Sequence, residues 1–171
     1  MAIKESPSFF LSSPITRKEL EEVIKCMKSG KAAGIDGIYP DMVTHLGQHA
    51  MDWLAAVMTN ILDKGTYPQI WKHARVVAIF KPGKPANESS SYRPIPLLSC
   101  IYKLLERIIL ARITPYVEPN IPVQKAGFKH QRGTTKQVLA FSSHIEAGFE
   151  NKLKTGAVLI DLSAAYDIVW T

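Results

Sequence analysis

The sequence has few cysteines. Of its 171 residues, only Cys26 and Cys100 are cysteine, and neither belongs to a Cys-x-x-Cys pair or a Cys/His cluster. A structural zinc site takes a set of closely spaced Cys and His ligands, so the sequence predicts none. We expect two reduced thiols that are at least partly buried.

Long hydrophobic runs are also absent. No apolar stretch reaches the roughly 20 residues that a membrane-spanning helix needs. Near the N-terminus, Lys4 and Glu5 are followed by Ser, Pro and Phe, without the apolar core and cleavage site of a secretory signal. These absences favour an intracellular protein without a membrane partner, in either the nucleus or the cytoplasm.

The motifs of several enzyme classes are missing. Neither a G-x-S-x-G nucleophile motif nor a P-loop occurs. His45 and His49 have the spacing of a zinc protease, but Leu46 stands where the catalytic Glu would be. A haloacid-dehalogenase-like phosphotransferase would carry a second Asp at position 163, which is Ser163 here. None of these chemistries is therefore expected.

Acidic residues are scarce in the middle of the chain. The whole chain has a formal charge of +6, whereas residues 81–136 hold ten basic and three acidic residues, or +7 (10 minus 3). Cationic side chains that displace condensed counterions bind polyanions without reading their sequence. The same charge fits a solvated surface equally well, so composition alone leaves both interpretations open.

Composition and periodicity predict one folded domain, with 46% hydrophobic and 21% charged residues. Apolar residues at helical spacing predict helices over about 16–30, 41–63 and 99–116, and a fourth from 133 onward. β-branched runs predict buried strands at 75–80 and 157–160. Because the order shows no regular βαβ alternation, we predict an α+β fold.

The helices carry finer signals. Thr16 and Glu19 fit a capping box, and Gly30 is expected to end the first helix. The third helix is expected to bury its apolar face and to keep its cations on the surface: Lys103, Arg107 and Arg112. The last helix is expected to turn four apolar side chains inward: Val138, Phe141, Ile145 and Phe149.

Asp161 follows directly after the apolar run 156–160. This pattern predicts a strand that delivers a carboxylate to its end, where a hard oxygen ligand for Mg²⁺ could face a cleft. A turn residue or a helix N-cap would give the same pattern. Asp167, six residues further on, fits a local cap better than a second ligand of the same ion.

Several segments, in order, resemble the reverse transcriptases of non-LTR (LINE-type) retrotransposons, the jockey-like ones among them. The family patterns are K-x-P-G-x-D-G-I, K-P-G-K followed by Y-R-P-I-S-L-L, Q-x-G-F-R-x-G-R-S-T and F-L-D-L-S-K-A-F-D. The similar segments here are 31–38 (K-A-A-G-I-D-G-I), 76–85 (V-V-A-I-F-K-P-G-K-P), 91–113 (beginning S-Y-R-P-I-P-L-L), 124–135 (Q-K-A-G-F-K-H-Q-R-G-T-T) and 159–167 (L-I-D-L-S-A-A-Y-D).

The resemblance implies roles for individual residues. Asp161 would be the first catalytic carboxylate and a metal ligand, joined by the backbone carbonyl of Leu162. Lys81 and Arg93 would grip the incoming nucleotide, and Tyr166 would lie under its sugar and select deoxynucleotides. The template-side surface would be shaped by Gln124, Gly127, Phe128 and Arg132.

The resemblance also implies an organisation. Residues 1–75 would form an N-terminal helical region, 76–154 the fingers, and 155–171 the start of the palm of a right-hand polymerase, as an N-terminal fragment. An RNA template, a DNA primer and deoxynucleotide triphosphates would be the partners. The family's Tyr/Phe-x-Asp-Asp motif does not occur. We therefore expect two-metal nucleotidyl transfer and Mg²⁺ only in the complete enzyme, and no activity from this chain alone.

Two other interpretations remain open. The basic segment could hold RNA without any metal site, which would make the chain a non-catalytic nucleic-acid-binding fragment. The chain could also be a non-functional relic of a mobile element. A role for Lys81 in nucleotide binding distinguishes the polymerase from the binding fragment, and failure to detect the protein in cells would favour the relic.

Overall fold

The computed structural model describes residues 11–122, 124–129 and 132–161. The chain divides into two compact units, Met1–Asn120 and Ile121–Thr171, which are described separately. The first unit contains helices α2 to α5 and a two-stranded sheet, and the second contains helix α6. Mixed helix and strand agree with the predicted α+β class. No helix within the described ranges combines the length and the apolar character that crossing a membrane requires.

Helix α2 (Arg17–Lys25) begins at the predicted capping box. The Glu19 amide donates to the Thr16 hydroxyl, and the Thr16 amide donates to the Glu19 carboxylate at 2.9 Å. The helix ends five residues before Gly30, because the amides of Cys26 and Met27 turn back onto carbonyls of its last turn. Gly30 instead has a left-handed φ of 67° in the following loop, so its predicted role as C-cap was wrong.

The predicted second helix is two helices, α3 (Pro40–Thr44) and α4 (Gln48–Lys64). His45 leaves the helical region, and Gly47 has extended backbone as the N-cap of α4. The hydrophobic periodicity continues across this break, which explains why one long helix was predicted. Gly65 ends α4 in the left-handed conformation, as expected for a C-terminal glycine.

Strands β1 (Arg75–Phe80) and β2 (Tyr92–Leu97) form an antiparallel hairpin. The short helices η1 (Gln69–Lys72) and η2 (Ser89–Ser91) precede the two strands. β1 was predicted, but every residue in it is exposed rather than buried. β2 was not predicted, because Pro94 and Pro96 argue against a strand; a sheet of only two strands tolerates them.

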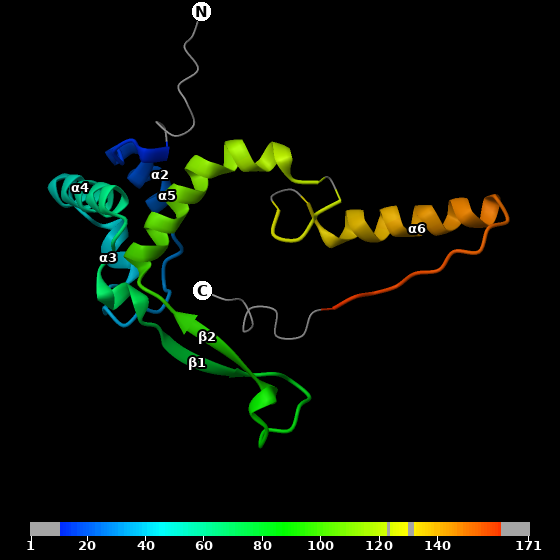
Figure 1. Cartoon of the computed structure of the whole chain (residues 1–171). Coiled ribbons are helices and arrows are strands. Elements are labelled where there is room, and N and C mark those ends of the chain that lie inside the picture. The colour runs from blue at the N-terminus through cyan, green and yellow to red at the C-terminus, as the bar shows by residue number, and fades with distance from the viewer. Residues whose placement is uncertain (1–10, 123, 130–131, 162–171) are drawn as a thin grey trace, which may run out of the picture. The chain divides into compact units, whose positions relative to one another are not determined.

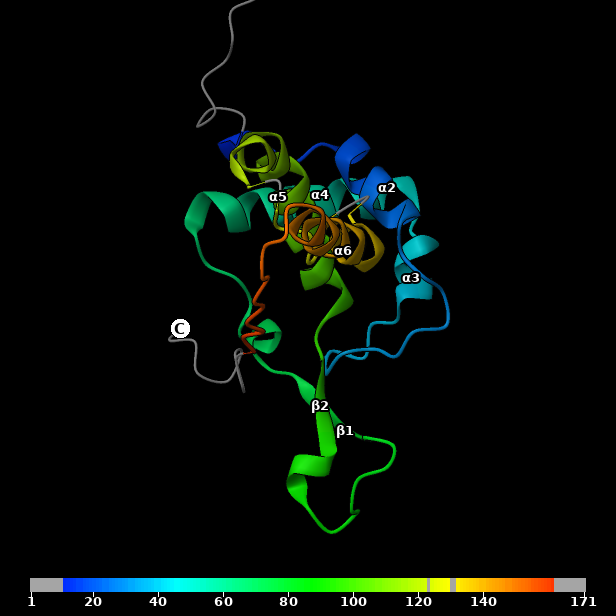
Figure 2. The same cartoon turned by 90° about the vertical axis from the view of Figure 1, so that its right-hand side faces the viewer.

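Helix α5 (Cys100–Val117) begins at Ser99, whose hydroxyl accepts from the Tyr102 amide at 3.3 Å, and η3 (Glu118–Asn120) follows. Figures 1 and 2 show α2 and α4 alongside α5, with the hairpin extending away from these helices. The hydrophobic core lies where the three helices meet. Its largest fully buried apolar side chains are Leu20, Val43, Met58, Leu104 and Ile108.

Arg112 was expected on the surface of α5, but its side chain is only 3% exposed. Its guanidinium donates to both carboxylate oxygens of Glu19, at 2.8 and 3.0 Å. It also donates to the carbonyls of Leu11, Ser13 and Pro14. An arginine can be buried when its donors are paired, and here the partners come from residues almost 100 positions away.

In the second unit, α6 (Thr134–Glu150) begins after Gly133 as predicted. Its apolar side chains were expected to face inward, but Val138, Phe141 and Phe149 are 62%, 47% and 72% exposed. No other helix or strand occurs among the described residues of this unit, so no described element of it covers these side chains. Gly148 permits the turn that follows, because a Cβ there would lie 2.4 Å from the Thr155 hydroxyl.

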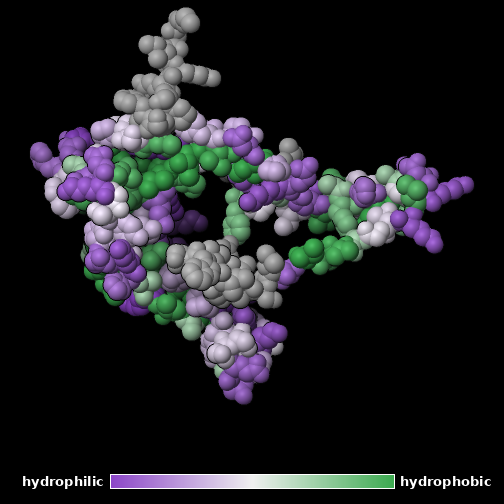
Figure 3. Space-filling model, in the orientation of Figure 1, coloured by the Kyte–Doolittle hydropathy of each residue, from purple (hydrophilic) through white to green (hydrophobic). Residues whose placement is uncertain are grey.

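The buried strand predicted at 157–160 is not formed. Residues 153–161 have no regular structure, and Val158, Leu159 and Ile160 are 86%, 94% and 85% exposed. Figure 3 shows hydrophobic side chains at the surface along this extended segment. A strand needs a hydrogen-bonding neighbour, and within the described ranges the only sheet is the β1–β2 hairpin.

Candidate functional site

Lys81 and Arg93 lie on one face of the hairpin, near its tip. Arg93 on β2 is opposite Ile79, and the Lys81 amide donates to the Ser91 carbonyl at 2.8 Å. The antiparallel register therefore continues one residue beyond β1. Because side chains alternate along a strand, Lys81 shares the face of Ile79 and is the diagonal neighbour of Arg93. The hairpin thus brings together the two cations that the family resemblance assigns to nucleotide binding.

The two side chains differ in what they contact. The Lys81 amino group donates to the Ser90 carbonyl at 2.7 Å and is therefore turned back onto the loop between the strands. Arg93 is exposed and forms no ion pair with a described carboxylate. A ligand anion at this face would meet the Arg93 guanidinium directly, whereas Lys81 would have to exchange a carbonyl for the ligand.

The opposite face of the hairpin carries an aromatic pair. The rings of Phe80 and Tyr92 lie with their centroids 5.5 Å apart and tilted by 59°. The Tyr92 hydroxyl donates to the Ala86 carbonyl at 3.1 Å and ties the connecting loop to this face. Tyr92 therefore braces the tip, and it lies on the other side of the sheet from the two cations.

The segment 31–38 holds the root of the hairpin. A Cβ on Gly34 would lie 2.6 Å from the Ser99 amide nitrogen, so the backbones pass in close contact. The Arg75 guanidinium donates to the Ala33 carbonyl at 3.4 Å, and the Cys100 thiol donates to the Ile38 carbonyl at 3.2 Å. Sequence reasoning recognised this segment but gave it no role. Of its two glycines, Gly34 was the one signal of a close backbone approach.

The predicted template-side residues lie in the second unit. Arg132 donates to the carbonyls of Pro122 and Lys125 at 3.1 and 2.9 Å and so closes the loop before α6. Phe128 has a left-handed φ of 58° and is 98% exposed. No atom lies within 4 Å of a Cβ placed on Gly127. The arrangement presents an aromatic ring to solvent, as a stacking surface would.

Gln124 departs from the family spacing. In the pattern Q-x-G-F the glutamine precedes the glycine by two positions, whereas Gln124 precedes Gly127 by three. Gln124 therefore lies one position before the place of the family glutamine. Its structure adds no contact that supports the role.

Asp161 is exposed at the end of the described residues, while Leu162 and Tyr166 lie outside them. Its carboxylate is a hard oxygen donor of the kind that Mg²⁺ takes. Among the described residues no group of three or more His, Cys, Asp or Glu side chains could hold a metal ion. The described part of the chain therefore supplies one suitable ligand and not a complete set.

The chain is similar to known reverse transcriptases. Residues 79–171 match the family model "Reverse transcriptase (RNA-dependent DNA polymerase)". The chain is 36% identical to the probable RNA-directed DNA polymerase from transposon BS of Drosophila melanogaster, over 92% of this chain and 18% of that protein. It is 34% identical to the RNA-directed DNA polymerase from mobile element jockey of the same species, over 97% of this chain and 19% of that protein.

A third relative is the probable RNA-directed DNA polymerase from transposon X-element of Drosophila melanogaster. It is 32% identical over 92% of this chain and 18% of its own length. The chain thus spans less than a fifth of the length of these relatives. The similarity extends well beyond the segment that the family model matches, and it includes the helices that precede the hairpin.

Proposed function

The chain belongs to the reverse transcriptase (RNA-dependent DNA polymerase) family, and we propose that it is part of an enzyme that copies retrotransposon RNA into DNA. An RNA template, a DNA primer and deoxynucleotide triphosphates would be its partners. In this proposal residues 1–75 lead into the fingers, 76–154 form the fingers, and 155–171 begin the palm.

The placement of Lys81 and Arg93 on one face of the hairpin tip carries the proposal. Nucleotidyl transfer depends on positioning a triphosphate and neutralising charge on its oxygens. A guanidinium offers a planar pair of donors to a phosphate, and an ammonium adds a compact charge beside it. The bend of Lys81 onto the Ser90 carbonyl gives the free hairpin a resting arrangement that a triphosphate would replace.

We assign the remaining roles by position in the family pattern. Asp161 and the Leu162 carbonyl would hold Mg²⁺, which in a two-metal reaction stabilises the attacking and leaving oxygens. Tyr166 would lie under the sugar and disfavour a 2′-hydroxyl. The template strand would contact the loop before α6, chiefly through Phe128 and Arg132, with Gly127 and the less well matched Gln124 beside them.

Nucleotide binding tests the proposal. Equilibrium titration of the 171-residue chain with a fluorescent deoxynucleotide triphosphate and Mg²⁺ would compare Lys81→Ala, Arg93→Ala and Lys84→Ala. A hydrogen bond to a charged group contributes about 1.5–3 kcal/mol, so Lys81→Ala and Arg93→Ala should each weaken binding by about tenfold or more. Lys84→Ala removes the same charge three residues away and should change it little.

The alternative is a nucleic-acid-binding fragment without nucleotide chemistry, which the +7 segment favours. In that case all three substitutions would weaken RNA binding slightly and equally, with a strong dependence on salt. Equal effects of Lys81→Ala and Lys84→Ala on the triphosphate would therefore reject the polymerase proposal.

We also expect these 171 residues alone not to extend a primer, because they contain Asp161 as the one predicted catalytic carboxylate and no Tyr/Phe-x-Asp-Asp sequence. A primer-extension assay on an RNA template with Mg²⁺ checks this. Extension that is lost in Asp161→Ala would contradict the expectation and would show that the chain carries a sufficient metal site.

A further inference from the structure

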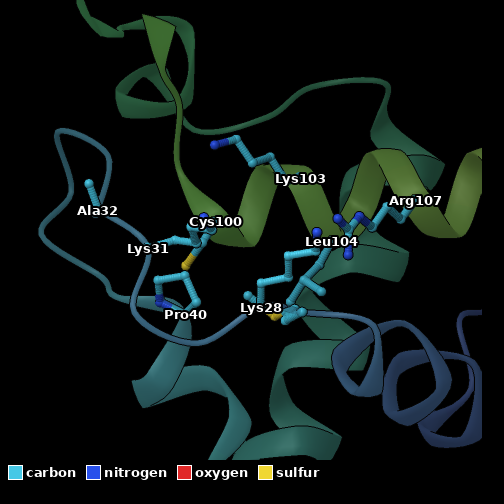
Figure 4. A pocket seen from close by; sticks show the side chains of 9 residues that line it. Lys28, Lys31, Ala32, Pro40, Cys100, Lys103, Leu104 and Arg107 are labelled. Atoms are coloured by element: carbon cyan, nitrogen blue, oxygen red, sulfur yellow. The ribbon is translucent and has the colours of Figure 1, made fainter. Parts of the chain in front are cut away.

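A second group of cations lies away from the hairpin tip, around a cavity in the first unit. The cavity has a volume of about 210 Å³. Lys28 and Lys31 reach it from the segment between α2 and α3, and Lys103 and Arg107 reach it from α5 (Figure 4). The remaining lining residues are small or apolar and form its floor: Met27, Ala32, Pro40, Cys100 and Leu104.

The four cations are not neutralised within the described part of the chain. No lining residue is acidic. None of the four forms an ion pair with a described carboxylate. Asp36 acts on the thiol of the lining residue Cys100; one of its oxygens accepts from the Ile38 amide, and the other is buried without a hydrogen-bond partner. Glu106 interacts with Tyr102. The four lining cations carry a formal charge of +4, which exceeds the single negative charge of Asp36 nearby, and such a lining attracts an anion.

Two hydrogen bonds hold the pocket walls in place. The Arg107 guanidinium donates to the Cys26 carbonyl at 3.2 Å, which joins α5 to the end of α2. The Cys100 thiol donates to the Ile38 carbonyl at 3.2 Å and joins the start of α5 to the loop. Burial, with a further effect of Asp36, raises the pKa of the Cys100 thiol. The thiol is therefore uncharged at neutral pH and does not oppose an anion.

We propose that this pocket binds a phosphate group of single-stranded RNA, with the adjoining sugar or base against the apolar floor. A cavity of about 210 Å³ is smaller than the roughly 300–1,000 Å³ of typical sites for whole small molecules. It suits one segment of a longer polymer whose neighbouring phosphates reach the remaining cations. That the phosphate belongs to RNA rests on the proposed function; the affinity for phosphate rests on the pocket alone.

RNA binding by charge-matched variants tests the pocket. Lys28→Gln with Lys103→Gln removes two pocket cations, and Lys18→Gln with Lys64→Gln removes two exposed lysines from α2 and α4 outside the pocket. Fluorescence anisotropy with labelled single-stranded RNA, over a range of salt concentrations, compares both double variants with the unchanged 171-residue chain. All four side chains are exposed, so both variants should fold, which circular dichroism verifies.

The pocket variant should bind RNA about tenfold more weakly at moderate salt. Its slope of log K against log salt should shrink by about 1 to 1.5, since each phosphate contact on a single strand contributes about 0.7. The control should change much less in both quantities. Equal losses in the two double variants would overturn the proposal, because they would show only the effect of net charge.

Two further titrations, with a free deoxynucleotide triphosphate and with poly-glutamate, test whether the pocket's ligand is RNA, a nucleotide or an acidic peptide. If the pocket variant loses affinity for a free deoxynucleotide triphosphate but not for RNA, the ligand is a nucleotide and the RNA assignment is overturned. If it loses affinity only for poly-glutamate, the pocket is a site for acidic peptides and the proposal fails. Lys81→Ala serves as an independent reference, because its effect on triphosphate binding tests the hairpin and is separate from the pocket.

Discussion

Arg112 joins the chain before α2 to the middle of α5. It satisfies three backbone carbonyls of residues 11–14 and both oxygens of Glu19, and Glu19 at the same time completes the capping box of α2. One guanidinium of α5 thereby holds the segment before α2 and the first turn of α2 in place. Nothing in the local sequence distinguishes Arg112 from Arg107, because the partners that bury it lie far away along the chain.

Replacing Arg112 with methionine should lower the free energy of unfolding by about 3 kcal/mol, since it leaves the partners of a buried charge unpaired. Chemical denaturation of the 171-residue chain measures the change. Arg17→Met is the control, because Arg17 pairs with Asp52 on the surface, where the two side chains are 39% and 49% exposed. Exposed pairs contribute less than about 1 kcal/mol, so this variant should differ little from the original chain.

The same ion pair gives a second measurement of that prediction. Partial burial by itself raises the pKa of Glu19, but hydrogen bonds from Arg112 and Thr16 outweigh it and hold the pKa below its ordinary value of 4.5. A lowered pKa stabilises the fold above the ordinary value, and this stability is lost as the pH falls through the folded pKa. Arg112→Met should flatten the acid side of the stability profile, and an unchanged profile would contradict the role of the pair.

At the scale of elements, the signals that marked where helices begin were reliable. The capping box at Thr16 and the glycine at position 133 each precede a helix in the structure, and the helix predicted from about 99 begins at Cys100 after the Ser99 cap. These signals are local, because they depend on residues within one turn of the helix. The break at 45–47 was not predicted, because the hydrophobic periodicity continues across it. Strand β2 was not predicted, because Pro94 and Pro96 are unusual in a strand.

The root of the hairpin gives a prediction at this scale. Gly34→Ala should lower the free energy of unfolding by about 1–3 kcal/mol, because its Cβ would lie 2.6 Å from a backbone nitrogen that cannot move aside as a side chain could. It should also weaken nucleotide binding, since the segment that anchors Arg75 would shift. Thermal unfolding and the triphosphate titration measure the two effects.

Gly156→Ala is the control for that substitution. A Cβ on Gly156 would meet no atom within 4 Å, and its φ lies outside the left-handed region. It should therefore change stability by less than about 0.5 kcal/mol. Equal stability of the two variants would show that the 31–38 segment does not pack against the start of α5 as the structure has it.

At the scale of the whole molecule, the sequence identified the apolar segments, but it did not distinguish those that are buried from those that are exposed. All the buried hydrophobic residues of the described chain lie between Ile15 and Ile108. α6 and residues 157–160 have the apolar patterns of a buried helix and a buried strand, yet Val138, Phe141 and Phe149 of α6 and the side chains at 158–160 are exposed. An apolar pattern indicates that a face is suited to burial, but the burial itself depends on a packing partner elsewhere in the chain, which the pattern does not specify.

The candidate site residues belong to both compact units. The hairpin of the first unit brings Lys81 and Arg93 together, while the predicted template-side residues belong to the second unit.

This distribution of buried residues predicts unequal local stability along one chain. Amide protons exchange slowly where opening requires unfolding of a packed core, and quickly where few buried contacts hold the backbone. In hydrogen–deuterium exchange of the 171-residue chain, α2, α4 and α5 should be the most protected elements, and α6 less so. Residues 153–161 should exchange fastest, because their described backbone belongs to no helix or strand. Slow exchange at 157–160 would contradict this order, because it would show that these residues are paired as a strand.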